Sequence, residues 1–178
     1  MFSSLCLGDE DFHLRIPTKP QFAKVDYEGA EIMIPEAGVY ENIGIFDVRA
    51  MYHSNVDKYG ICWTTLTEEG TDCGNGISFD TKDKGLLCRQ YGMYHPDIAA
   101  AITFTSRQTL GELRDHAEAL GFKVRYGHTD SIMCEVPNPE AGLAALQHIN
   151  QEMHPIITEF EKWSSKFLII AKNRYAGL

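Results

Sequence analysis

The 178-residue sequence lacks several features that would place it in a membrane or outside the cell. It has no run of about 18 consecutive apolar residues, the length that a membrane-spanning helix needs. Its five cysteines form no C-x-x-C pair, and their odd number argues against a disulfide framework or a zinc site. The first residues, MFSSLCLGDEDF, have no basic start and reach acids by Asp9, unlike a secretory signal. We therefore expect a cytoplasmic protein with reduced thiols and no membrane segment.

Positive charge is also scarce. Sixteen Lys and Arg residues face 25 Asp and Glu residues, which gives a formal net charge of −9. Because affinity for phosphate backbones comes from clustered basic residues, this balance disfavours a freestanding nucleic-acid binder. Contact with DNA would need positive charge from metal ions or from a partner. The length itself predicts one domain with a substantial core.

Alternating or short apolar runs predict several strands. The strands that we expect span residues 28–35, 42–48, 122–127 and 131–136, followed by a strand or hairpin over 166–178. Residues 35–38 are typical of a turn. Residues 67–85 are rich in Gly, Asp and Thr and predict a long surface loop. Residues 1–26 show no sustained period and are expected to form an N-terminal arm.

Two segments predict helices. Apolar residues recur at three- and four-residue steps over residues 96–120, with Gly121 as a plausible C-cap. Asn138 and Pro139 are typical of a helix start, and we expect that helix to reach about Glu161, bent at Pro155. The resulting order predicts an α+β fold with a ferredoxin- or RRM-like core. Its antiparallel sheet has four or more strands, with helices packed on one face, away from the strand-end acids.

Those acids are Asp47 and Asp130, each at the end of an apolar strand. Carboxylates on adjacent strand ends can hold a hard divalent cation, which prefers oxygen ligands. Two such ions are the main requirement of phosphoryl and nucleotidyl transfer. From their spacing alone, both residues are more readily explained as ordinary turn acids, because Asp is common in turns.

Three motifs in order resemble the palm domain of family B DNA polymerases. VYENIGIFDVRAMYHSNV is similar to the first palm motif, Asp-x-x-Ser-Leu-Tyr-Pro-Ser, with Asp47 on its acid. RYGHTDSIM is similar to Tyr-Gly-Asp-Thr-Asp-Ser, with Asp130 on the second acid. IIAKNRYAGL is similar to the Lys-Lys-x-Tyr segment that closes the palm. The stretch EGAEIMIPEAGVYENI and the helix before the third motif also match, so the resemblance covers residues 27–178.

The resemblance implies a metal site and a reaction. Asp47 and Asp130 would be the catalytic metal ligands for Mg²⁺, with Mn²⁺ as an alternative. The carbonyl of Val48 and the side chain of His128 would be secondary ligands. His128 replaces the first acid of the third motif, and a neutral imidazole suits Mn²⁺ better than Mg²⁺. A turn residue without any role is the alternative for His128.

The resemblance also implies partners, namely primer–template DNA, an incoming dNTP and further polymerase domains or subunits. Arg49 and Tyr52 would contact the nucleotide, Tyr52 by excluding a 2′-hydroxyl; a partly buried structural Tyr is the alternative. The residues implied to contact DNA are Tyr126, Gly127, Thr129, Lys172, Arg174 and Tyr175. Exposed apolar surface of a palm would also favour a homo-oligomer or binding to other proteins.

The sequence departs from the family pattern at several positions. Ala50 and His53 replace Ser and Pro in the first motif, and Asn173 replaces a Lys in the closing motif. The Lys-x-x-x-Asn-Ser-x-Tyr-Gly helix of the fingers has no counterpart in residues 67–95, where the fingers would be inserted. We therefore expect a palm that needs other domains and is weak or inactive alone. The alternative is a non-catalytic palm-like scaffold of a replication complex.

Overall fold

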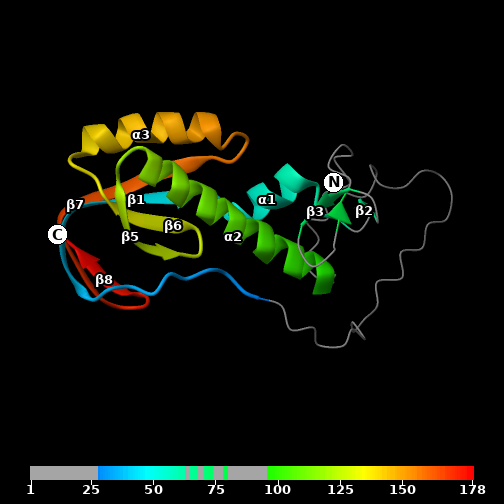
Figure 1. Cartoon of the computed structure of the whole chain (residues 1–178), viewed down its shortest axis with the longest axis horizontal. Helices are drawn as coiled ribbons and strands as arrows, with labels where there is room; N and C mark the ends of the chain where they lie inside the picture. The colour runs from blue at the N-terminus through cyan, green and yellow to red at the C-terminus, as the bar shows by residue number, and fades with distance from the viewer. Residues whose placement is uncertain (1–27, 63–64, 68–69, 74–77, 80–95) are drawn as a thin grey trace, which may run out of the picture.

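A computed structural model describes residues 28–62, 65–67, 70–73, 78–79 and 96–178. Its centre is an antiparallel sheet with the strand order β5-β6-β1-β7-β8 (Figure 1). The strands of this sheet are β1 (Gly38–Val48), β5 (Lys123–His128), β6 (Ser131–Glu135), β7 (Thr158–Ala171) and β8 (Arg174–Gly177). The helices are α1 (Met51–Tyr59), α2 (Pro96–Ala119) and α3 (Pro139–Glu152). The α+β class with an antiparallel sheet is therefore confirmed.

One face of the sheet forms the main core under α2 and α3 (Figure 1). Phe46 and Val48 of β1 lie on this face with Ile132 and Cys134 of β6, because alternate strand residues share a face. The helices and the C-cap of α3, Met153, contribute the following buried residues: Leu110, Leu113, Ala117, Ala145, Ile149 and Met153. Both helices therefore cover the face opposite to that of Asp47, which precedes Val48.

The opposite face has a smaller core. It consists of Ile43, Ile45, Tyr126, Met133, Phe167 and Ile169. Ile32, Met33 and Tyr40 pack against it in place of a helix. Asp47 follows Ile45 at the next position of this face, so the acid lies at the end of an apolar strip.

The predicted start of α3 and the predicted end of α2 have local causes. The N–H of Ala141 donates to Oδ1 of Asn138 at 2.8 Å, so Asn138 is the N-cap of α3 and Pro139 follows it as predicted. At the end of α2, Gly121 adopts a φ of 86°, which glycine tolerates best. The chain can therefore turn directly from α2 into β5.

Two predictions for the N-terminal part are wrong. Residues 28–35 form no named strand, and only Ile32 makes an isolated bridge, to His128. Residues 35–37 form no turn either, and β1 begins at Gly38. β1 thus begins before the expected strand over 42–48, and Asn42 within it adopts a φ of 57°.

The expected extent of the second helix is also wrong. α3 ends at Glu152, and β7 begins at Thr158 within the range assigned to the helix. Asn150 explains the change of structure: its amide accepts from the N–H of Thr158 at 2.7 Å and donates to the carbonyl of Thr158 at 3.0 Å. The side chain thus fixes the strand start against the helix end. The predicted hairpin over 166–178 is confirmed as the end of β7 and β8.

The region expected to be a loop contains a small second sheet. Its strands are β2 (Leu66–Thr67), β3 (Thr71–Asp72) and β4 (Ser78–Phe79), in the order β2-β4-β3. Phe79 and Cys73 are fully buried against Ile61 and Ala101, so this part is not simply a surface loop. The rest of the predicted fingers region and the arm over 1–26 lie outside the described residues. None of the described helices has the length and apolar character that a membrane crossing needs.

Candidate active site

The two predicted acids lie at one rim of the sheet. Asp47 is opposite Ser131 in the β1–β6 pairing. Asp130 immediately precedes Ser131, and its carbonyl accepts a hydrogen bond of 2.8 Å from the N–H of Val48. The strand end that carries one acid is therefore bonded to the turn that carries the other.

A row of paired residues crosses the sheet at this rim. Glu159 of β7, Asp47 of β1, Ser131 of β6 and His128 of β5 are successive register partners. Since directly opposed residues in antiparallel strands share a face, the side chains of this row lie on the face away from α2 and α3. Ile32 extends the row through its bridge to His128. We call the two acids of this row, Asp47 and Glu159, together with the neighbouring Asp130 and Glu161, the acidic rim.

The β5–β6 turn has an unusual backbone. Thr129 and Asp130 connect His128 to Ser131, and Thr129 adopts a φ of 54°. This left-handed conformation is disfavoured for a β-branched residue. Two hydrogen bonds hold it: the N–H of Asp130 donates to the carbonyl of His128 at 2.7 Å, and the N–H of Thr129 donates to the carbonyl of Glu31 at 3.0 Å.

The rim crowds negative charge around Asp47. The pKa of Asp47 is raised to about 6, first by partial burial and then by the charges of Asp130, Glu161 and Glu159, in that order of size. A carboxylate becomes harder to ionise when it is desolvated and near other carboxylates. The four acids therefore form a region that would favour a cation.

Sequence reasoning missed Glu159 and Glu161, because both were assigned to the tail of a helix. The alternation Thr-Glu-Phe-Glu-Lys after Pro155 was the available signal for a strand. β7 also has a register irregularity opposite Ile45 and Phe46, which leaves Glu161 without a register partner on β1. Alternation of strand residues alone could therefore not place Glu161 beside Asp47.

The first residues of the YGHTDS stretch have different surroundings. Tyr126 is 0% exposed in the smaller core, so its side chain is not on the surface. Its hydroxyl donates to Oδ1 of Asn173 and accepts from the N–H of Asn173, both at 3.2 Å. Gly127 is buried beneath Met33, whose Sδ lies only 2.8 Å from where a Cβ would stand. His128 is half-buried, with its ring centroid 6.3 Å from that of Tyr126.

The β7–β8 hairpin approaches the same face. Asn173 occupies its turn with a φ of 59°, so the residue that departs from the closing motif is the one bonded to Tyr126. Tyr175 stacks on Phe167 at 5.5 Å between ring centroids. Burial raises the pKa of the Tyr175 hydroxyl, with contributions from Tyr126, Glu161 and Asp130. Tyr175 therefore lies near the acids, whereas the side chains of Lys172 and Arg174 are exposed and make no hydrogen bond or ion pair among the described residues.

The remaining predicted residues follow β1. Arg49 is exposed, and its Nε lies 3.6 Å from a carboxylate oxygen of Glu159. Ala50, with a φ of 47°, turns the chain into α1, a helix that the sequence prediction lacked. Tyr52 is 39% exposed in the first turn of α1. The structure thus brings Arg49 to the acidic rim. The side chain of Tyr52, in the helix that follows, is accessible.

The acidic rim suits a hard divalent cation in its donor chemistry. Asp47 and Asp130 supply carboxylate oxygens, and the raised pKa of Asp47 reflects burial first and then a repulsion that a bound cation would relieve. In the part of the chain that the structure describes, no group of three or more His, Cys, Asp and Glu side chains is arranged to hold a metal ion. The protein would therefore provide only part of a coordination shell, as in sites that share their ions with a substrate.

Comparison with known proteins identifies the family. A family model described as DNA polymerase family B matches residues 85–178, more than half of the chain. The chain belongs to DNA polymerase family B. The match includes the third and closing motifs, and the family inferred from the sequence is therefore confirmed.

Individual relatives of this family B chain are distant but span most of it. A DNA polymerase of Archaeoglobus fulgidus is 25% identical over 222 residues, which cover 91% of this chain and 28% of the relative. The catalytic subunit of DNA polymerase alpha from Saccharomyces cerevisiae is 22% identical, over 87% of this chain and 14% of the relative. The solved structure of the family B DNA polymerase from Pyrobaculum calidifontis has a TM-score of 0.67 at 20% identity. It covers 92% of this chain and 29% of that one, and supports the fold.

Two facts about length follow. The family B chain spans less than a third of each of these relatives. In addition, the alignment with the archaeal polymerase is longer than the chain of 178 residues. The relative therefore has additional residues inside the matched stretch.

Proposed function

We propose that residues 27–178 are the palm of a family B DNA polymerase and contribute to two-metal nucleotidyl transfer in DNA replication. The observation that carries this proposal is the joining of Asp47 and Asp130 at one rim by the Val48–Asp130 hydrogen bond, within a crowd of acids. Asp47, Asp130 and the carbonyl of Val48 would hold Mg²⁺ or Mn²⁺, with His128 as a secondary ligand. When bound, such ions activate the attacking hydroxyl and neutralise charge on the phosphates.

The other residues of the site would bind and orient the substrates. Arg49 can exchange its exposed ion pair with Glu159 for a phosphate, since an exposed pair is worth little. Tyr52 has an accessible side chain that would lie under the sugar of a dNTP. Thr129, Lys172, Arg174 and Tyr175 would contact primer–template DNA, while Tyr126 and Gly127 would support the turn from within.

We further propose that the chain is fingerless and acts with other polymerase domains or subunits. The longer alignment supports this, because the relative has residues within the matched stretch that this chain lacks. The net charge of −9 supports it too, because duplex binding needs basic surface from elsewhere. Retention of both principal acids favours this function over a non-catalytic scaffold.

Metal binding by the purified chain tests the site. Titration with Mn²⁺, followed by electron paramagnetic resonance, should give an affinity that falls by about tenfold or more in Asp130→Ala, because one of two principal ligands is lost. Glu140→Ala removes an exposed acid at the start of α3, on the other side of the sheet, and should bind as the wild type does. Equal affinity of wild type and Asp130→Ala would contradict the proposed site.

Primer extension tests the reaction. Extension by the chain alone, in Mg²⁺ or Mn²⁺, should be very weak, and addition of partner subunits should raise it only when Asp47 and Asp130 are intact. Robust extension by the chain alone would contradict the proposed dependence on other domains.

A further inference from the structure

A short segment before β1 lies along the free edge of β5. We call residues 28–33 the strap. The N–H of Met33 donates to the carbonyl of Gly127, and the N–H of Thr129 donates to the carbonyl of Glu31, both at 3.0 Å. Between them Ile32 forms its antiparallel bridge with His128. The strap therefore pairs directly with the hairpin that carries Asp130.

One arginine ties the strap to α2. Nη1 of Arg107 donates to the carbonyls of Glu28 and Gly29 at 2.7 and 2.8 Å. Nη2 also lies 3.4 Å from the Glu28 carboxylate, and the guanidinium stands over the ring of Phe104. The Arg107 side chain is only 19% exposed. The planar guanidinium suits a contact with two carbonyls at once, which the ammonium group of a lysine cannot reproduce fully.

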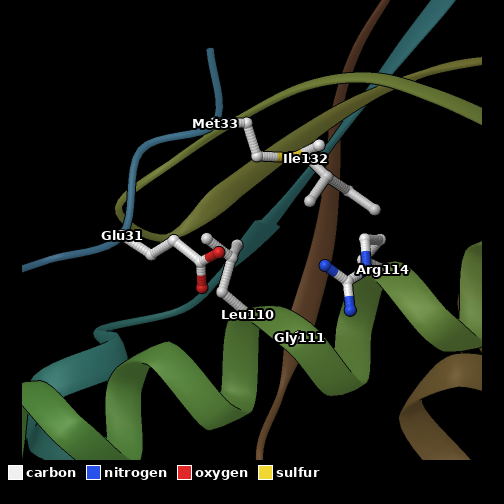
Figure 2. A pocket seen from close by; sticks show the side chains of 6 residues that line it. All are labelled: Glu31, Met33, Leu110, Gly111, Arg114 and Ile132. Atoms are coloured by element: carbon white, nitrogen blue, oxygen red, sulfur yellow. The ribbon is translucent and has the colours of Figure 1, made fainter.

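Further along, the strap and α2 are not closely packed. A small hollow separates them, lined by Glu31, Met33, Leu110, Gly111, Arg114 and Ile132 (Figure 2). The head groups of Glu31 and Arg114 face one another across it without a hydrogen bond between them. Arg114 instead donates to Asp115. The strap is therefore held by Arg107 at one end, and at the other by β5 and the smaller core, on which Ile32 and Met33 pack.

The turn needs this support because Thr129 is held in a disfavoured left-handed conformation. The strap fixes Thr129 from one side, and Val48 fixes the Asp130 carbonyl from the other. We propose that Arg107 is a positioning residue, which anchors the strap on α2 and thereby orients Asp130 toward Asp47. Only the role of Asp130 as a metal ligand rests on the proposed function.

Amide hydrogen exchange and Mn²⁺ titration of the full chain test this. In Arg107→Ala, the amides of Thr129 and Met33 should exchange at least about tenfold faster, because local opening of the strap becomes easier. The Mn²⁺ dissociation constant should rise several-fold. Arg107→Lys can reach one carbonyl and should restore part of both effects.

Lys58→Ala is the matched control. Lys58 is similarly buried, at 22% exposure, and also bonds to α2 through Glu112, but it does not contact the strap. Lys58→Ala should change neither the amide exchange of Thr129 and Met33 nor the Mn²⁺ dissociation constant. Met33→Pro removes the N–H that donates to Gly127 while leaving α2 intact, and should reproduce the faster exchange of Thr129.

The outcomes separate this proposal from the proposed function. Unchanged exchange of Thr129 in both Arg107→Ala and Met33→Pro would overturn the positioning role, whatever the metal affinity. Faster exchange with an unaltered Mn²⁺ dissociation constant would overturn it too, because the strap would then not orient Asp130. If the wild type binds no Mn²⁺, the proposed metal site fails, and Thr129 exchange alone decides whether Arg107 holds the turn.

Discussion

The two faces of the five-stranded sheet are built from alternate residues of the same strands but are covered very differently. The face toward α2 and α3 is an apolar core, in which Phe46 and Val48 are fully buried. The other face has a smaller core that ends at four acids, and among the described residues the strap, Tyr40 and the β7–β8 hairpin pack against it instead of a helix. The first arrangement stabilises the fold, while the second holds charge at a rim where it opposes folding. Substitutions on the two faces should therefore affect different properties.

The largest effect on stability should come from the helix-covered face. Leu113→Ala removes a fully buried side chain of α2 and should lower the free energy of unfolding by about 3 kcal/mol, through lost burial and a cavity. Urea denaturation measures this. Leu143→Ala on α3, where the side chain is 53% exposed, should cost less than about 1 kcal/mol. Equal losses in the two variants would show that α2 does not supply the core in solution.

A pair of helical glycines tests packing on the same face more finely. A Cβ at Gly142 of α3 would lie 2.7 Å from Cε2 of Phe160, whereas at Gly111 of α2 it would meet nothing within 4 Å. Gly142→Ala should therefore destabilise by about 1–3 kcal/mol through overpacking. Gly111→Ala should stabilise by about 0.5–1 kcal/mol through helix propensity. Thermal unfolding of both variants gives the comparison, and the same sign for both would contradict it.

How far the sequence predicts each region depends on how local the cause is. The start of α3 was predictable because Asn138 bonds within its own first turn and Pro139 suits the next position. The β5–β6 hairpin was predictable from two β-rich runs around a short polar link. The start of β7 was harder to place, because alternation after Pro155 indicates a strand but the contact between Asn150 and Thr158 fixes where it begins. α1 gave no clear signal either, since its N-cap Ala50 makes no side-chain hydrogen bond.

The site divides in the same way. Asp47 and Asp130 were predicted from motifs, and the structure brings them to one rim. Glu159 and Glu161 join them only through the register of β7, which has an irregularity beside them. Arg107 contacts residues almost 80 positions earlier in the chain, so neither periodicity nor a motif could indicate it.

The acidic face should give a small effect, similar in size to that of Gly111→Ala and opposite in sign to the effects of Leu113→Ala and Gly142→Ala. The folded pKa of Asp47 is raised from 3.8 to about 6, so the native state binds more protons than the unfolded state between these values. Stability should therefore fall as pH rises from about 4 to 6. Asp47→Asn should remove this loss and raise the free energy of unfolding at pH 7 by about 1 kcal/mol, a figure reduced for solvent screening of a half-buried group. Urea denaturation across this pH range measures the difference.

Asp57→Asn, which neutralises an exposed acid of α1, is the control. Its free energy of unfolding should depend on pH in the same way as that of the wild type. Saturating Mn²⁺ sharpens the comparison, because a ligand that binds only the native state stabilises it. The free energy of unfolding of the wild type at pH 7 should then rise, whereas that of Asp47→Asn should rise less. The difference in stability between the two proteins should therefore shrink or change sign. Identical pH profiles for wild type and Asp47→Asn would mean that neither burial nor the neighbouring acids raise the pKa of Asp47. The acids of this face would then not oppose folding, and the two faces would differ only in what covers them.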